Sequence, residues 1–187
     1  MAKRFAYLYL SALFLNSVIA GAHAQGAASF PNEIPASVQR VVDGDTIHVR
    51  VQDGVQISGL GRGSNVKVRI VGIDAPESCQ PWGKEATKAL RQMLPLGSVV
   101  LLRPTGVDKY GRLLSDVYAG DARNDGQFNV AAAMVVSGNA WSWVERNGGG
   151  RYAKEERDAR ANAKGLWQDP NAQQPSVFRK ENGSCKN

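Results

Sequence analysis

Two short segments with strict apolar–polar alternation constrain the fold of this chain more than any other feature. Residues 46–51 (TIHVRV) and 66–70 (VKVRI) place an apolar side chain at every second position. Because successive side chains of a strand point to opposite faces, this period of two predicts strands with one buried face. The glycine-rich segment 52–65 predicts a long, flexible hairpin connection, so we expect the two strands to be antiparallel.

Helix patterns appear mainly in the C-terminal half of the chain. Residues 83–94 repeat an apolar side chain every four positions and are followed by a proline. An Ala-rich stretch at 129–137 and a stretch rich in helix formers at 152–164 each end before a glycine. Residues 99–102 and 112–119 read as strands on either side of a loop. These elements predict an α+β fold, a small five-stranded antiparallel β-barrel of the oligonucleotide-binding (OB) type with three helices.

The N-terminus has the pattern of a removable export signal. Lys3 and Arg4 precede a mostly apolar stretch at 5–20, and Ala-His-Ala at 22–24 matches a cleavage site. The apolar stretch is short for a membrane span, and no later segment approaches the ~20 apolar residues that a span needs. We therefore expect a signal peptide at 1–24 and a mature protein that is periplasmic or secreted, with no membrane span after signal removal.

The mature chain is expected to form one domain. Cleavage after Ala24 leaves 163 residues, a length that suits one core. Residues 25–36 are small and polar and predict a loose lead-in, so that structure begins near Ser37. We place the domain at 37–168. The polar, proline-containing tail at 169–187 is expected to be poorly ordered unless something tethers it.

Charge and metal-ligand composition narrow the possible functions. The chain has 23 Lys and Arg against 17 Asp and Glu, a formal net charge of +6. This mild basic bias suits a polyanionic partner without demonstrating one. Two cysteines and two histidines are too few for a Cys/His zinc site. A bound metal would therefore depend on oxygen ligands.

Three short polar clusters contain residue types that phosphate chemistry needs. They are 42–46 (VDGDT), 69–77 (RIVGIDAPE) and 108–112 (DKYGR). Each alone has a simpler interpretation: a β-turn, an acidic turn beside a solvated strand arginine, and a turn with exposed charges. A rigid acidic turn can also offer carboxylate and carbonyl oxygens to a hard divalent cation, and arginine pairs well with phosphate.

In this order, the three clusters resemble the thermonuclease family of staphylococcal-nuclease-like proteins. The resemblance spans roughly residues 37–168. Further matches are G-x-E-A at 83–86, Gly138 with Ala140, Ala159-Arg160 and Gly165-Leu166-Trp167. The resemblance implies a calcium-dependent endonuclease that hydrolyses both DNA and RNA at the 5′ oxygen of the phosphodiester and leaves 3′-phosphates. Such an enzyme acts with little sequence specificity. We expect this protein to be a monomer.

The resemblance also implies which residues would hold the metal and assist proton transfer. The Ca²⁺ ligands would be Asp45, Asp74 and the carbonyl of Ala75, and the candidate general base would be Glu77. Two roles for Glu77 stay open, removing the proton of the attacking water and orienting that water.

The resemblance further implies that Arg69 and Arg112 are catalytic together with Glu77, and that other residues bind the rest of the substrate. Arg69 and Arg112 would grip the scissile phosphate, where planar guanidiniums suit bidentate contact. Lys109 and Tyr110 would contact the phosphate at the end of the bound nucleotide. Trp143 is a candidate for stacking on a base; the alternative is a core or edge aromatic.

Two other classes of protein account for fewer of these residues. A non-catalytic nucleic-acid-binding barrel would not need Asp45, Asp74 and Glu77 together with Arg69 and Arg112. An exported calcium-binding structural protein would use the carboxylates but leave both arginines unexplained.

The two cysteines are a disulfide candidate. Cys79 and Cys185 are the only cysteines of a chain that we expect to reach an oxidising compartment. A bridge between them would tie the tail to the loop two residues beyond Glu77. Free thiols, or pairing with another chain, are the alternatives.

Overall fold

A computed structural model describes residues 32–51, 57, 60, 65–120, 126–144, 148–183 and 185. The predicted signal peptide, most of the predicted lead-in and most of the predicted hairpin connection at 52–65 lie outside these residues. The first strand begins at Ile34, three residues before the predicted start of structure at Ser37.

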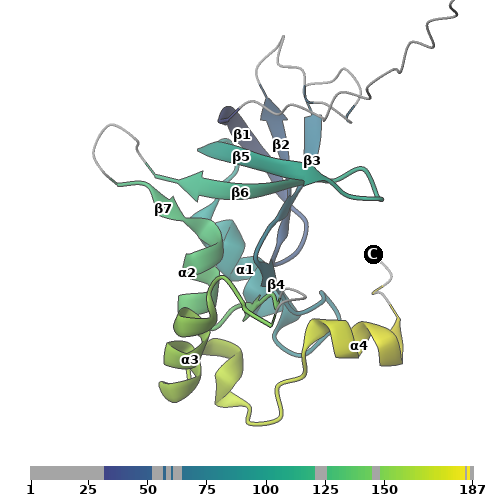
Figure 1. Cartoon of the computed structure of the whole chain (residues 1–187), viewed down its shortest axis with the longest axis vertical. Coiled ribbons are helices and arrows are strands. Elements are labelled where there is room, and N and C mark those ends of the chain that lie inside the picture. The colour runs from purple at the N-terminus through teal and green to yellow at the C-terminus, as the bar shows by residue number, and fades with distance from the viewer. Residues whose placement is uncertain are drawn as a thin grey trace, which may run out of the picture.

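Five strands form the barrel (Figure 1). They are β1 (Ile34–Val41), β2 (Thr46–Val51), β3 (Asn65–Ile70), β5 (Val99–Val107) and β6 (Leu113–Ala119). The order across the sheet is β3-β2-β1-β5-β6, and pairing between β3 and β6 closes it. A short strand, β7 (Phe128–Asn129), extends the sheet beside β6.

The barrel is mixed, so the prediction of an antiparallel barrel is wrong in one respect. The β3–β6 pair is parallel, whereas β1–β2, β2–β3, β1–β5 and β5–β6 are antiparallel. The reason is geometric. Five strands in a closed ring cannot all run opposite to both neighbours, because an odd number of alternations leaves one parallel pair.

The alternation in the sequence defines the inside of the barrel. Apolar residues of β2 and β3, among them Ile47, Val49, Val68 and Ile70, are fully buried. His48 and Lys67 between them face outward and are partly or fully exposed. The predicted buried face is therefore confirmed, and it places the polar faces of β2 and β3 on the outside of the barrel.

All three predicted helices are present, at one end of the barrel (Figure 1). They are α1 (Gly83–Met93), α2 (Val130–Val136) and α3 (Ala153–Ala161). The side chain of Asn129 caps α2 by accepting a hydrogen bond from the Ala132 amide at 3.0 Å. Nearby, the short strands β4 (Ile73–Asp74) and β8 (Trp141–Ser142) pair antiparallel. None of the helices in the described part of the chain has the length and apolar composition needed to cross a membrane.

Two motif glycines, Gly138 after α2 and Gly165 after α3, allow two backbone segments to cross closely. The Leu166 amide donates to the Gly138 carbonyl at 2.8 Å. A Cβ at Gly138 would lie 2.1 Å from the Lys164 carbonyl oxygen, and one at Gly165 would lie 2.2 Å from the Gly138 oxygen. Both residues also have positive φ angles, so these motif residues are explained by packing.

The C-terminal tail contains a fourth helix, which the sequence analysis did not predict. Helix α4 (Pro175–Asn182) begins with a proline at its first turn. Cys185, three residues beyond it, forms a disulfide with Cys79, with 5.7 Å between the two Cα atoms. The tether that the sequence analysis left open is therefore present, and residues 175–182 of the tail form a helix next to it.

Candidate active site

The candidate site lies where the β1–β2 turn meets the β3–β4 segment. Asp45 immediately precedes β2, and Asp74 is the last residue of β4. Nη2 of Arg69, near the end of β3, lies 3.1 Å from Asp45 Oδ2 and 3.3 Å from Asp74 Oδ1. One guanidinium nitrogen therefore contacts two buried carboxylates.

Main-chain contacts fix Asp45 and Arg69. The Ala75 amide donates to Asp45 Oδ2 at 3.0 Å, and the Asp45 carbonyl accepts from the Ile70 amide at 2.8 Å. Arg69 also donates to the carbonyl oxygens of Ile70 at 2.6 Å and Ile73 at 2.9 Å. These bonds hold Arg69 against the two carboxylates rather than in solvent, where its simpler interpretation had placed it.

Gly44 allows the two acidic turns to approach each other. A Cβ at this position would lie 2.6 Å from the Ala75 Cβ and 3.0 Å from the Ala86 Cβ, so a larger residue would push the turns apart. The D-G-D spacing of the first cluster is thus a packing requirement of the site as well as a turn preference.

Glu77 follows Pro76 in the loop between β4 and α1. Its amide donates to Gln80 Oε1 at 3.1 Å, which fixes the loop, and its carboxylate is partly exposed. Glu77 Oε1 accepts a hydrogen bond from Arg179 Nη1 at 2.8 Å. The sequence-predicted Asp45, Asp74, Ala75, Arg69 and Glu77 therefore lie in one site.

Arg179 is a site residue that the sequence analysis missed. It comes from α4, and its guanidinium makes two contacts with Asp74, Nη1–Oδ1 at 3.2 Å and Nη2–Oδ2 at 3.0 Å. No sequence motif marks it, because it lies 105 residues from Asp74 in a polar segment. The only available signal was Cys185, six residues later, which can bring the tail to this loop.

Burial and mutual repulsion raise the pKa values of two acidic groups. The pKa of Asp74 is raised by burial and by Asp45, while Arg179 and Arg69 oppose the rise. The pKa of Asp43 is raised from 3.8 to about 7 by burial and by the neighbouring charge of Asp45. Asp43 is therefore a further acidic group at this site, although the sequence analysis assigned it no role.

The shift at Asp43 predicts how the stability of the metal-free protein depends on pH. Between about pH 4 and pH 7 the folded state keeps a proton that the unfolded chain releases, so stability falls as pH rises through this window. The substitution Asp43→Asn removes the titrating carboxyl group and with it this fall in stability with rising pH. Relative to wild type, the variant should gain stability on the order of 1 kcal/mol or more at pH 8, since one pKa unit is about 1.4 kcal/mol.

Urea unfolding at pH 4 and pH 8 in excess chelator measures this effect. Asp158→Asn, on an exposed part of α3, is the matched control and should keep the wild-type pH dependence. An Asp43→Asn variant whose stability falls with pH as steeply as that of wild type would contradict the assignment.

Arg112, Lys109 and Tyr110 occupy the turn between β5 and β6. Asp108 organises this turn: Oδ2 accepts from Arg112 Nε at 2.7 Å, and Oδ1 accepts from the Tyr110 amide at 2.8 Å. Lys109 and Arg112 both lie over the Tyr110 ring, which is 72% exposed. The ion pair of Arg112 with Asp108 lies within the turn, and the pairing of β3 with β6 places the turn beside the strand of Arg69.

Trp143 lies on the surface beside the site. It is 45% exposed, and its amide donates to the Gly72 carbonyl at 2.9 Å, next to β4. The core position belongs to Trp141, which is 6% exposed and packs edge-on against Trp167. The exposure of Trp143 does not match a core aromatic, whereas it is compatible both with stacking on a base and with an edge aromatic.

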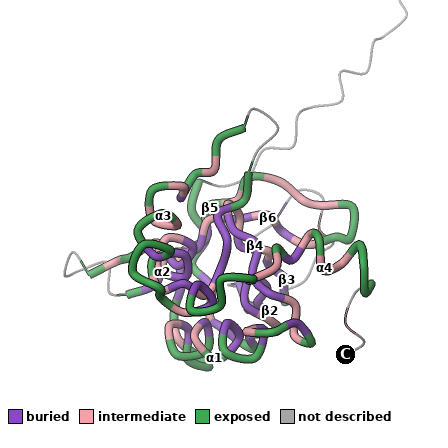
Figure 2. The backbone as a smooth tube through the Cα atoms, turned by 90° about the horizontal axis from the view of Figure 1, so that it is seen from below, coloured by how far each residue is buried: buried purple, intermediate pink, exposed green. Residues whose placement is uncertain are grey.

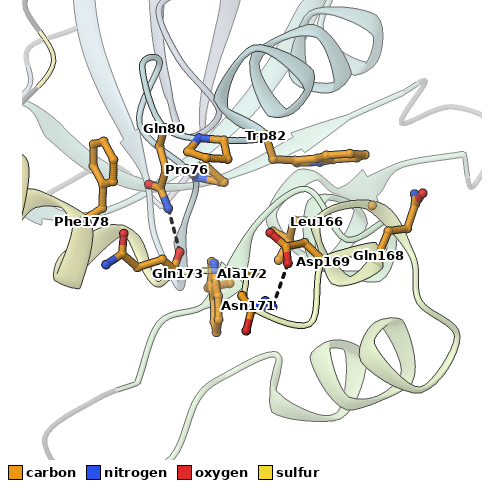
Figure 3. A pocket seen from close by; sticks show the side chains of 13 residues that line it. Pro76, Gln80, Trp82, Leu166, Gln168, Asp169, Asn171, Ala172, Gln173 and Phe178 are labelled. Atoms are coloured by element: carbon orange, nitrogen blue, oxygen red, sulfur yellow. Dashed lines mark hydrogen bonds between the residues drawn. The ribbon is translucent and has the colours of Figure 1, made fainter.

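A cavity of about 680 Å³ adjoins the loop of Glu77 (Figure 3). Pro76, Gln80 and Trp82 line it from the loop before α1, and Phe178 lines it from α4. The Gln80 side chain donates to the Gln173 carbonyl at 2.7 Å across this space. The cavity is thus built partly by the tail, whose position depends on the Cys79–Cys185 bridge.

The donor atoms at the site fit a hard divalent cation. Asp45, Asp74 and the Ala75 carbonyl offer only oxygen, which Ca²⁺ prefers. Within the described residues, no cluster of three or more His, Cys, Asp or Glu side chains is arranged for a metal. A cation here would therefore bind through two carboxylates and a carbonyl, with water or substrate completing its shell.

Comparison with known proteins identifies the class to which this fold and site belong. Residues 67–169 match the family model described as staphylococcal nuclease homologue. The chain therefore belongs to the staphylococcal nuclease family and is a nuclease.

Individual relatives support the same assignment. The chain is 36% identical over 157 residues to protein ParB of Escherichia coli, covering 81% of this chain and 82% of the relative. It is 36% identical over 155 residues to micrococcal nuclease of Shigella flexneri, covering 80% and 83%. It is 33% identical over 147 residues to an uncharacterized endonuclease of Escherichia coli O157:H7, covering 79% and 86%. The resemblance inferred from the three clusters is confirmed.

Proposed function

We propose that this protein is an exported, calcium-dependent phosphodiesterase that hydrolyses DNA and RNA with little sequence specificity. It would cleave at the 5′ oxygen and leave 3′-phosphates. The observation that carries the proposal is the contact of one Arg69 nitrogen with both Asp45 and Asp74, with Glu77 three residues farther along the same loop. This arrangement offers a metal site, a phosphate-binding cation and a base within one short region.

The residues of the site have complementary roles in this proposal. Arg69 binds the scissile phosphate and neutralises charge that grows on its oxygens, and Arg112 does the same from the β5–β6 turn. Glu77 accepts a proton from, or orients, the attacking water. Calcium held by Asp45, Asp74 and the Ala75 carbonyl would supply further positive charge at the phosphate.

The outer face of β1–β3 supports recognition through phosphates. Arg40 pairs in register with His48, and His48 pairs with Lys67, so three basic side chains form a row across the strands. The pKa of His48 is lowered by burial and by repulsion from Arg40 and Lys67. Within the described residues, neither Arg40 nor Lys67 forms an ion pair. Such a row favours a polyanion without reading its sequence.

Export is supported by the disulfide, because such bonds persist mainly in oxidising compartments. The predicted signal at 1–24 lies outside the described residues, so the cleavage site is a separate proposal. Mass spectrometry of the mature protein, recovered from the periplasm or medium, should give an N-terminus at Gln25.

Metal removal tests the proposed activity directly. Purified mature protein should cleave plasmid DNA and single-stranded RNA in the presence of Ca²⁺, and excess chelator should abolish cleavage of both. Asp74→Asn should lose activity, whereas Asp158→Asn on α3 should not. Undiminished cleavage in chelator would contradict the calcium assignment.

The same assay separates the other classes of protein. A binding barrel would retain DNA without cutting it, and a calcium-binding structural protein would do neither. The proposed products carry 3′-phosphates, so they should support polymerase extension only after phosphatase treatment.

A further inference from the structure

Helix α4 brings a cation to the candidate metal site. We propose that Arg179 competes with the divalent cation for Asp74 and that the Cys79–Cys185 disulfide strengthens this competition. The proposal rests on the function proposed above, because it assumes that Asp74 binds metal. It makes Arg179 a residue that sets the metal affinity of this chain.

The contacts of Arg179 resemble those of a bound counter-ion. Its two terminal nitrogens contact both oxygens of Asp74, at 3.2 and 3.0 Å, and Nη1 also contacts Glu77 Oε1 at 2.8 Å. A planar guanidinium is suited to this two-oxygen contact. Asp74 is 4% exposed, so solvent screens the pair less than it would a surface pair.

A divalent cation and Arg179 require the same oxygens. Asp74 Oδ1 already accepts from Arg69 as well as Arg179, and Oδ2 accepts from Arg179. These three hydrogen bonds occupy three of the roughly four lone-pair sites of the carboxylate, so a cation that binds Asp74 must lie a few ångströms from the guanidinium and repel it. Metal binding therefore requires Arg179 to withdraw from Asp74 at least in part.

The tail that carries Arg179 makes few other contacts with the barrel. Among the residues of α4, only Pro175 is buried, and the helix lies at the edge of the molecule (Figure 2). Besides the contacts of Arg179, the tail is held by the Gln80–Gln173 hydrogen bond and by packing of Ala172 against the cluster of Trp141 and Trp167 on one side, and by the Cys79–Cys185 bridge on the other. Because the helix is so exposed, the bridge should raise the effective concentration of Arg179 at the site.

Competition of this kind is reciprocal. If Arg179 weakens metal binding, bound metal must weaken the docking of Arg179 by the same factor. Removing Arg179 should therefore tighten metal binding, and adding metal should loosen α4. Neither effect depends on measuring activity.

Isothermal titration with Ca²⁺ tests the first effect on the full mature protein. Arg179→Gln should bind Ca²⁺ roughly 5-fold or more tightly than wild type, the lower end of common coupling strengths. Lys180→Gln is the matched control, since it removes the same charge from the next residue of α4, which is exposed. That variant should keep the wild-type affinity. The double variant Cys79→Ser/Cys185→Ser should bind Ca²⁺ more tightly than wild type, but no more tightly than Arg179→Gln.

Hydrogen exchange tests the second effect without changing Arg179. In the Cys79→Ser/Cys185→Ser protein, Ca²⁺ should speed amide exchange across residues 175–182. Unchanged exchange there, or an Arg179→Gln affinity equal to or weaker than that of wild type, would overturn the proposal. If neither wild type nor Arg179→Gln binds Ca²⁺, the calcium assignment fails as well, whereas equal binding by both removes only the role of Arg179.

Discussion

Replacing Arg69 with lysine should lower kcat by on the order of 10²-fold or more, the scale seen when one transition-state donor is removed. Arg69 contacts Asp45, Asp74 and the Ile73 carbonyl through Nη2 and the Ile70 carbonyl through Nη1. A lysine ammonium carries the same charge but has no planar fork, so it cannot make these contacts and also bind a phosphate in two places. Arg112→Lys should show a loss of the same kind.

Single-turnover cleavage of DNA at saturating Ca²⁺, with circular dichroism as the check on folding, measures this loss. Arg103→Lys is the matched control. Arg103 is also a barrel arginine in an ion pair, with Glu33, but it is about half exposed on β5. Wild-type rates in a folded Arg69→Lys protein would remove Arg69 from the proposed catalytic group.

Features of the fold that depend on local pattern were predictable, whereas those that depend on ring closure were not. The alternation in 46–51 and 66–70 indicates which faces are buried, and α1 begins at the predicted residue, Gly83. The parallel β3–β6 pair follows from closing five strands into a ring, which no local pattern records. Strand β5 also continues through Val107, into the segment predicted as loop, because it pairs with β6 up to Leu113.

The residues of the candidate site also fall into those that a local sequence pattern could predict and those that it could not. Asp74, Ala75 and Glu77 are close in sequence to Arg69, so a motif can contain them all. Arg179 reaches the same carboxylates from a polar tail that has no apolar pattern to mark α4 as ordered. The tail that carries it is tied to the site loop by a bridge between two residues 106 apart, and a pairing at that distance gives no local signal.

Loss of that bridge should have the largest effect on stability. The disulfide closes a loop of 106 residues, for which the chain-entropy model gives about 4.7 kcal/mol as an upper guide. The loss should be smaller, about 2–4 kcal/mol, because the unbridged tail can detach from the barrel without unfolding it. For a chain of this length that corresponds to a fall in Tm on the order of 10 °C.

Calorimetry in excess chelator compares Cys79→Ser/Cys185→Ser with oxidised wild type, and chelator removes any contribution from bound metal. Reductant should lower the Tm of wild type toward that of the variant and leave the variant itself unchanged. Arg179→Gln keeps the bridge but loses the contacts with Asp74 and Glu77, so its Tm separates the two contributions. A cross-link that restricts the unfolded chain must shift the folding equilibrium toward the folded state. If the cysteine variant has the same Tm as oxidised wild type, the bridge therefore stabilises neither the barrel nor the docked tail.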